Sequence, residues 1–184
     1  MAIHIQAPFD EQTIAMLKSG DSVLISGIVY TARDAAHKRM MEELEQGKSL
    51  PFDVSGQVIY YVGPTPAKPG EIIGSAGPTT SGRMDKYAPA LLELGLKGMI
   101  GKGFRSPAVR DSIVKNKALY LAAIGGSGAL LARSIKEVEL VAYEDLGTEA
   151  IRRLRIEQFP AVVINDIHGN DLYQDGVQKY STES

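Results

Sequence analysis

The sequence predicts an α/β fold in which helices pack on a mixed sheet or a small barrel. Short runs rich in Val and Ile alternate with segments of helical periodicity, the pattern of α/β architecture. Some expected strands follow one another without a helix between them, which argues against a purely parallel, doubly wound sheet. No repeat, low-complexity segment or linker interrupts residues 1–173, so one domain is expected there, followed by a loose polar tail over 174–184.

Start and stop signals divide the first half of the chain. Gly20 and Gly47 follow helical patterns, as helix-ending glycines do, and Asp34 is expected to be an N-cap. The stretch GPTPAKPG cannot be helical because of its prolines and glycines. The expected elements are a helix over 10–19, a strand over 22–30, a helix over 35–46, a strand over 54–62, a loop over 63–70, a strand over 72–76 and, after a turn at 77–82, a helix ending near 95.

The second half continues the alternation. Ser106-Pro107 predicts a helix start, with serine as the N-cap and proline in the first turn. The expected elements are a strand over 98–101, the helix after Ser106, a strand over 118–124, the GGSG turn with a helix to 135, a strand over 138–143, a helix over 148–155, a strand over 159–164 and a hairpin-like turn over 166–171.

Composition and charge exclude several classes of protein. With 20 basic and 22 acidic residues, the chain lacks the positive field that recruits nucleic acid or an anionic membrane. It has no cysteine, hence neither disulfides nor thiolate ligands, and His4, His37 and His168 lack metal-ligand spacing. The N-terminus has no signal-peptide pattern and no apolar run approaches about 20 residues, so a cytoplasmic protein is expected.

Three segments place a cationic side chain where an expected strand ends, and such junctions form ligand sites in α/β proteins. Arg33 lies just before a helix start, where backbone N–H groups and the helix dipole favour an anion. The alternative is that Arg33 pairs with Asp34 or a surface carboxylate. Lys102, between two glycines, either reaches into a cleft or extends into water.

The segment GPTTSGRMD at 77–85 is the most informative of the three. It combines glycines that allow close backbone approach, three hydroxyls and an arginine that can bind a carboxylate bidentately. The alternative is an ordinary helix start, which needs only one capping hydroxyl. A ligand site is therefore favoured at this turn.

Two further features have structural explanations. The GGSG turn at 125–128 could hold a phosphate, but tight packing of a helix on a sheet is the commoner reason for such glycines. His37 lies on an apolar helix stripe, and the pattern alone favours a hydrogen-bonded structural histidine.

Taken together, these segments resemble the β subunit, or C-terminal half, of class I fumarases and L(+)-tartrate dehydratases. The similarity runs through most of the chain, and GPTTSGRMD is its most specific part. It includes the GD-x-V-x-I-x-G pattern from Gly20, RDAAH at 33–37, Gly63-Pro64, GSAGPTTSGRMD at 74–85, GKG at 101–103, Gly125-Gly126 and the run from Phe159-Pro160-Ala161 to Gly169-Asn170-Asp171.

The resemblance implies a swivelling β/β/α domain, similar to the mobile domain of aconitase. It implies a [4Fe–4S] cluster held by three cysteines of a partner α subunit or N-terminal half, where the open iron acts as a Lewis acid. By the same resemblance, Thr79 is the catalytic base, and Arg33, Arg83 and Lys102 bind the dicarboxylate. His37, Thr80 and Ser81 are expected to support the site, and the general acid is expected to come from the partner.

The expected reaction is the reversible dehydration of (S)-malate to fumarate, with tartrate dehydration as the alternative. Two other classes stay open: a non-catalytic module that binds or senses a dicarboxylate, and a stand-alone enzyme that uses the GGSG turn on phosphorylated substrates. The isolated chain is expected to fold and to be inactive, with half a site and an exposed apolar patch facing the interface with its partner. Homodimerisation of the isolated chain is a further expectation.

Overall fold

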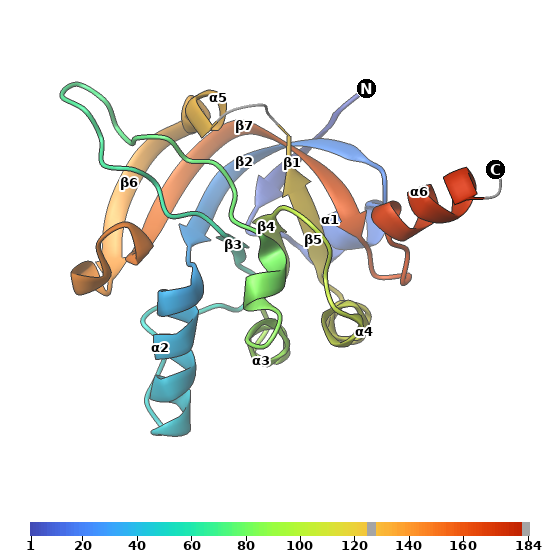
Figure 1. The fold of residues 1–184 in the computed structure, drawn as a ribbon, viewed down its shortest axis with the longest axis horizontal. Helices are drawn as coiled ribbons and strands as arrows, with labels where there is room; N and C mark the ends of the chain where they lie inside the picture. Colours follow the sequence, from blue (N-terminus) through green and yellow to red (C-terminus); the bar gives the residue numbers. More distant parts are fainter. Residues whose placement is uncertain (125–127, 182–184) are drawn as a thin grey trace.

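The computed structural model describes residues 1–124 and 128–181, which contain one mixed seven-stranded sheet (Figure 1). The strand order is β1-β2-β3-β4-β5-β7-β6, and an additional pairing of β2 with β7 closes the five strands β2, β3, β4, β5 and β7 into a barrel. The strands are β1 (Ile3–Ala7), β2 (Ser22–Thr31), β3 (Val58–Tyr60), β4 (Gly98–Gly101), β5 (Leu119–Ala123), β6 (Ile135–Ala142) and β7 (Ile151–Asn165).

The long strands β2 and β7 make closure possible. Strands β1 to β5 are joined by parallel pairings, whereas β7 runs antiparallel to β2, β5 and β6. Along β7, Phe159 pairs with Ile25 of β2 and Val163 pairs with Leu121 of β5, so one strand bridges both sides of the barrel. The mixed sheet or small barrel expected from the sequence is confirmed.

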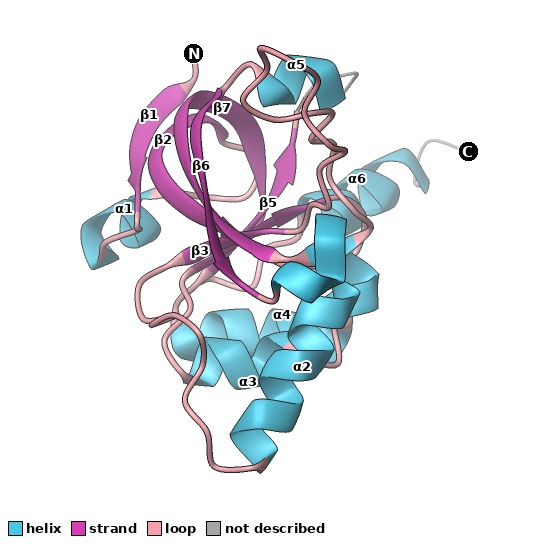
Figure 2. Cartoon of the chain, turned by 90° about the vertical axis from the view of Figure 1, so that its left-hand side faces the viewer, coloured by secondary structure: helices cyan, strands magenta, loops and turns pink. Residues whose placement is uncertain are grey.

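The helices gather mainly at one end of the barrel, where α2, α3 and α4 lie together (Figure 2). The helices are α1 (Glu11–Met16), α2 (Asp34–Glu45), α3 (Ala88–Glu93), α4 (Pro107–Asn116), α5 (Gly128–Ala132) and α6 (Leu172–Ser181), with 3-10 helices η1 (Ser81–Met84) and η2 (Glu144–Glu149).

Alternation along β3, β4 and β5 separates two apolar cores. Val58 and Tyr60 belong to one cluster with the other inward side chains of the barrel, whereas Ile59 belongs to the cluster under the helices. Ile100 and Met99 divide in the same way. Because successive strand residues face opposite sides, short strands that are apolar throughout serve both cores.

Two capping predictions have different outcomes. Ser106 caps α4 as expected, because its side chain accepts a hydrogen bond from the N–H of Val109. Asp34, expected as the N-cap of α2, is instead the first helical residue, and Arg33 is the N-cap without a side-chain cap bond. The Ala35 N–H instead donates to a carboxylate from η2, Glu149, at 3.2 Å.

Several expected elements differ from the structure. The prediction of a helix over 148–155 is wrong. From Ile151 onward the segment belongs to β7, because its pairing with β2 and β6 outweighs the helical periodicity. The expected strand at 72–76 is also absent, because Ser75 pairs locally with Thr65, by a bond from the Ser75 N–H to the Thr65 Oγ1 (2.7 Å) and one from the Thr65 N–H to the Ser75 carbonyl (3.0 Å).

Other boundaries are shifted. The strand expected over 54–62 is regular only at Val58–Tyr60, and the helix expected to end near 95 is divided into η1 and α3. Residues 172–181, which include most of the segment expected to be a loose polar tail, form α6. Asp166 fixes the preceding turn, since its carboxylate accepts hydrogen bonds from the N–H groups of Ser19, His168 and Asn170.

Candidate active site

The candidate side chains gather where parallel strands β2, β3 and β4 end. Arg33 comes two residues after β2, Lys102 directly follows β4, and the loop that leads to Thr79 follows β3. Because carboxyl ends of parallel strands share one edge of a sheet, these residues belong to one end of the barrel. The turn at 125–128 follows β5 at the same edge, but residues 125–127 lie outside the described part of the chain.

Backbone contacts fix Thr79 beside β3. Its N–H donates to the carbonyl of Tyr61 at 2.7 Å. The preceding loop is held from below by the Tyr60 hydroxyl, which donates to the Ala76 carbonyl at 2.5 Å, and the Ala76 N–H donates to Gly128 at 3.1 Å. The Thr79 side chain is half-buried, and its hydroxyl forms no hydrogen bond with any described residue. Within the described part of the chain, the backbone of Thr79 is thus fixed while its hydroxyl is not engaged.

The loop that carries Thr79 is joined to the loop that carries Lys102. Thr80 and Lys102 form a parallel bridge, and the N–H of Ser81 donates to the Lys102 carbonyl at 2.8 Å. The side chains of Lys102 and Thr80 are exposed, and Lys102 has no ion-pair partner among the described residues. Ser81, by contrast, points inward, is fully buried and contacts the hydroxyl of Tyr120 at 2.8 Å.

Arg33 extends over Gly63, at the start of the β3 loop. A Cβ at Gly63 would lie 2.7 Å from the Arg33 Nη1 and 2.9 Å from its Cδ, so only glycine leaves room for this guanidinium. The Arg33 Nε lies 4.0 Å from Glu149 and is buried without a hydrogen-bond partner among the described residues. The ion pair with Asp34 considered above is not formed, and the contact with Glu149 is a long one.

Asp34 pairs instead with Arg83. This ion pair connects the start of α2 to η1. Arg33 is the N-cap of α2 and Arg83 binds the next residue, Asp34, so both cations are attached to the N-terminus of the same helix. Just over half of the Arg83 side chain is exposed (54%), which leaves its guanidinium accessible to a second carboxylate. Arg33, Arg83, Lys102 and Thr79 are thus brought together by contacts between their loops.

His37 is fully buried one turn into α2, and its Nδ1 lies 2.8 Å from the carbonyl of Arg33. A carbonyl only accepts, so in the neutral ring Nδ1 carries the proton and the buried Nε2 has no partner among the described residues. Burial lowers the pKa of His37 to about 4; the bond to Arg33 opposes this shift and the nearby Arg105 charge adds to it. His37 contacts Arg33 from inside the fold and does not reach solvent.

Sequence analysis did not identify Arg105, which is the only basic residue in the described chain that is classed as buried apart from the histidine at 37. Its Nε bonds Asp85 at 2.7 Å, and its Nη2 donates to the Tyr61 hydroxyl at 3.2 Å. Asp85 ends the GPTTSGRMD segment, so the aspartate of this motif binds a buried arginine. The only sequence signal for this ion pair was the place of Asp85 in the motif; nothing in the sequence pointed to Arg105.

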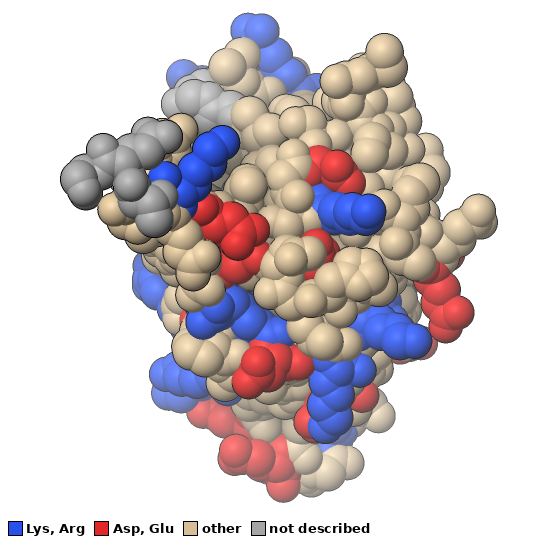
Figure 3. All heavy atoms as spheres, turned by 90° about the vertical axis from the view of Figure 1, so that its right-hand side faces the viewer, with Lys and Arg blue, Asp and Glu red and all other residues tan. Residues whose placement is uncertain are grey.

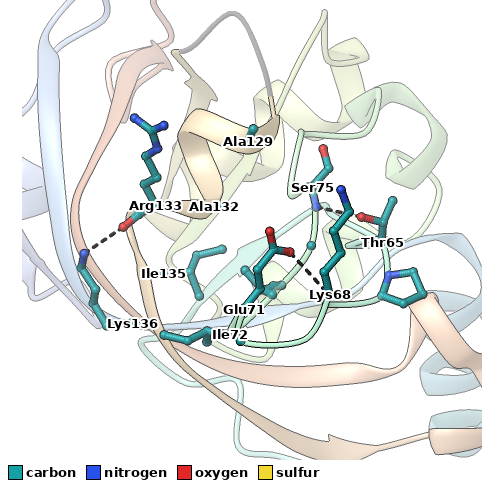
Figure 4. A pocket seen from close by; sticks show the side chains of 14 residues that line it. Thr65, Lys68, Glu71, Ile72, Ser75, Ala129, Ala132, Arg133, Ile135 and Lys136 are labelled. Carbon is teal, nitrogen blue, oxygen red and sulfur yellow. Dashed lines mark hydrogen bonds between the residues drawn. The ribbon is translucent and has the colours of Figure 1, made fainter.

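A cavity of about 630 Å³ lies outside this site, between the loop at 65–75 and the segment from α5 to the start of β6 (Figure 4). Lys68, Glu71, Arg133 and Lys136 line it, and the Lys136 Nζ donates to the Arg133 carbonyl at 2.9 Å. It contains none of the seven candidate side chains. On the face that carries α4 and α6, acidic and basic side chains are interspersed, so no broad positive field covers this face (Figure 3).

The chain does not offer the ligands of an iron–sulfur cluster. It has no cysteine, and its described residues contain no group of three or more His, Cys, Asp or Glu arranged to hold a metal ion. A cluster would therefore need ligands from elsewhere. Within 1–124 and 128–181, no helix is both long and apolar enough to cross a bilayer.

The fold and the candidate residues define a mixed α/β barrel domain with a threonine and three cations at the carboxyl edge of its parallel strands. The chain belongs to the fumarase C-terminus family, whose sequence model matches residues 1–176.

Individual relatives agree with this assignment. The chain is 43% identical over 157 residues to the anaerobic class I fumarate hydratase of Escherichia coli K12, covering 84% of this chain and 29% of that protein. It is 38% identical over 175 residues to fumarate hydratase 2 of Leishmania major (93% and 31%). It is 37% identical over 171 residues to a putative L(+)-tartrate dehydratase subunit beta of Methanocaldococcus jannaschii (90% and 88%). The chain thus spans about a third of the fumarate hydratases that it matches.

Proposed function

We propose that this chain is the β subunit of an iron–sulfur hydro-lyase that reversibly dehydrates a 2-hydroxy dicarboxylate, with (S)-malate and fumarate as the pair. The observation that carries the proposal is the hydroxyl of Thr79, which has no hydrogen-bond partner among the described residues. It lies on a loop bonded to the one that bears Lys102 and followed by Arg83. Membership in the fumarase C-terminus family supports the reaction class.

The three cations match the charge of the substrate. Two carboxylates leaving water need about two cationic partners, and a third can stabilise the charge that develops as the carbon next to a carboxylate loses its proton. We assign these roles to Arg33, Arg83 and Lys102. The partly buried Arg33, whose Nε has no hydrogen-bond partner among the described residues, is suited to the first carboxylate.

Thr79 is the proposed base. Its hydroxyl must be deprotonated to act, which needs the nearby cations to stabilise the alkoxide in a site closed to solvent. The alkoxide takes the proton from carbon, the electron pair of that C–H bond forms the double bond, and the hydroxyl leaves as water after protonation by a general acid. We expect that acid to come from the partner.

We propose that a cysteine-containing α subunit holds the [4Fe–4S] cluster and completes the site. The absence of cysteine in this chain is compatible with that division, and the relative named as a tartrate dehydratase subunit beta is matched over 88% of its length. The cytoplasm is the proposed location. The same relative makes L(+)-tartrate the second candidate substrate, since the two reactions differ by one hydroxyl that one or two polar contacts can select.

Anaerobic co-production of this chain with its α subunit tests the proposal through iron and sulfide content and through dehydration of malate and of tartrate. Replacing Thr79 by alanine should lower kcat by about 10²-fold or more while the complex stays assembled. Thr79→Ser retains the hydroxyl, and Thr13→Ala, on the remote helix α1, controls for loss of a threonine. Near-normal turnover by Thr79→Ala would exclude the assigned base, and an assembled, iron-replete wild-type complex that dehydrates neither acid would favour a binding module.

A further inference from the structure

A buried arginine lies beneath the candidate site without reaching it. The Arg105 side chain is fully buried, so it cannot contact a dicarboxylate at the surface. Its Nε bonds the Asp85 Oδ1 at 2.7 Å, its Nη2 donates to the Tyr61 hydroxyl at 3.2 Å, and its guanidinium lies 4.8 Å from the centre of the Tyr120 ring. One cation thus contacts groups from three separate segments.

Each of these groups also holds one of the loops that carry candidate residues. The Tyr61 carbonyl accepts the N–H of Thr79 at 2.7 Å. Asp85 lies two residues after Arg83, and its second oxygen accepts the N–H of Ser106 at 2.7 Å.

The third group, Tyr120, connects the segment of Ser81 to the segment of Gly103. Its hydroxyl contacts the Ser81 Oγ and the Gly103 carbonyl, both at 2.8 Å. Ser81 in turn donates its N–H to Lys102. The contacts of Arg105 therefore reach the segments of Thr79, Arg83 and Lys102 from below.

The chemistry of Arg105 suits this arrangement. A guanidinium offers five donors in fixed directions and a flat face, so it can bind a carboxylate, a hydroxyl and an aromatic ring at once in one geometry, whereas the compact ammonium of lysine has neither the planar fork nor the flat face. A buried ion pair contributes little net stability compared with apolar packing, because both charges lose their water. The buried charge of Arg105 is therefore better explained by a role in fixing the positions of the loops than by a contribution to stability.

We propose that Arg105 is a positioning residue that fixes the loops of Thr79, Arg83 and Lys102 relative to one another and never touches the substrate. The consequence for catalysis rests on the function proposed above, whereas the consequence for the loops does not. The two parts of the inference are therefore tested by separate measurements.

The chain offers a control with the same three residue types at a more exposed position. Arg39 also binds an aspartate, Asp145, with two bonds of 2.7 Å, and its guanidinium also lies 4.8 Å from the centre of a tyrosine ring, that of Tyr143. This second Arg–Asp–Tyr group joins α2 to η2 and contacts none of Thr79, Arg83 or Lys102. Arg105→Lys and Arg39→Lys therefore make the same chemical change, one beneath the site and one away from it.

The first experiment measures amide hydrogen exchange in the full chain. In Arg105→Lys, the N–H groups of Ser81 and Ser106 should exchange about tenfold faster or more, as expected when a bond to a charged group is lost. The N–H of Val163, which bonds Asp21 at 2.9 Å, is the internal reference and should change little. Arg39→Lys should leave all three rates unchanged.

If Arg105→Lys fails to fold, Tyr61→Phe replaces it, since it removes only the hydroxyl that accepts from the Arg105 Nη2. It should speed exchange severalfold at the N–H of Thr79, which bonds the Tyr61 carbonyl at 2.7 Å. Unchanged exchange at Ser81 and Ser106 in folded Arg105→Lys, or at Thr79 in Tyr61→Phe, would overturn the inference, whatever reaction the protein catalyses.

The second experiment measures kinetics in the complex with the cluster-bearing subunit. A variant that is only less stable has fewer active molecules, so its apparent kcat falls at constant KM. Loops that shift relative to one another weaken the carboxylate contacts, so Arg105→Lys should raise KM about tenfold or more. An unchanged KM would contradict the positioning role. An inactive wild-type complex would instead contradict the proposed function and leave the exchange result to decide the role of Arg105.

Discussion

The buried histidine of α2 should make the stability of the fold depend on pH. The pKa of His37 is lowered to about 4, whereas the ordinary value is 6.5. Between these values the unfolded chain binds a proton at this position that the folded chain does not, so stability falls as the pH falls. The full difference corresponds to about 3 kcal/mol, of which about 2 kcal/mol is lost by pH 5.

His37→Asn isolates this contribution. The Asn side-chain amide can occupy the place of Nδ1 and keep a hydrogen bond to the Arg33 carbonyl, but it does not titrate. Urea unfolding of the chain at pH 7.5 and pH 5 should show the wild type losing about 2 kcal/mol more than the variant. His4→Asn changes an exposed histidine and should behave as the wild type.

The comparison is made between pH values within each variant, so the packing lost at His37 cancels. Carboxylates that titrate in the same range cancel as well, because both chains carry them. Equal losses in the wild type and His37→Asn would refute the reasoning and would mean that the imidazole gains a proton or a partner in the folded chain.

Three other substitutions test the packing around the site and the barrel. In Gly101→Ala, the new Cβ would lie 2.0 Å from the Ser81 Oγ, so urea unfolding should show a loss of about 1–3 kcal/mol; an unchanged midpoint would mean that this contact relaxes freely. Gly63→Ala would displace the Arg33 guanidinium, and in the assembled enzyme KM should rise severalfold with little change in stability; a normal KM would argue against Arg33 as a substrate ligand. Leu154→Ala removes a fully buried side chain of the barrel interior and should cost about 2–5 kcal/mol by thermal or urea unfolding, and a smaller cost would indicate that the interior collapses around the cavity.

Local signals explain the elements that sequence analysis identified. The apolar run at Gly98–Gly101 is β4, and the serine at 106 caps α4, because each depends on residues within a few positions. The segment at 148–155 is different: its apolar residues fit helical spacing, but Ile151 faces one core and Leu154 the other, as in a strand. Only pairing with β2 and β6, distant in sequence, decides between these two periodicities.

The candidate site divides in the same way. The sequence by itself determined which residues are candidates, because Arg33, Thr79, Arg83 and Lys102 stand in segments that follow expected strands, and because the resemblance assigns roles to them. Only the tertiary structure decided how they are held: that Asp34 binds Arg83, that Ser81 turns inward, and that Arg105 is buried beneath them. The physical reason is that burial and long-range partners depend on the closure of the barrel, which no short stretch of sequence encodes.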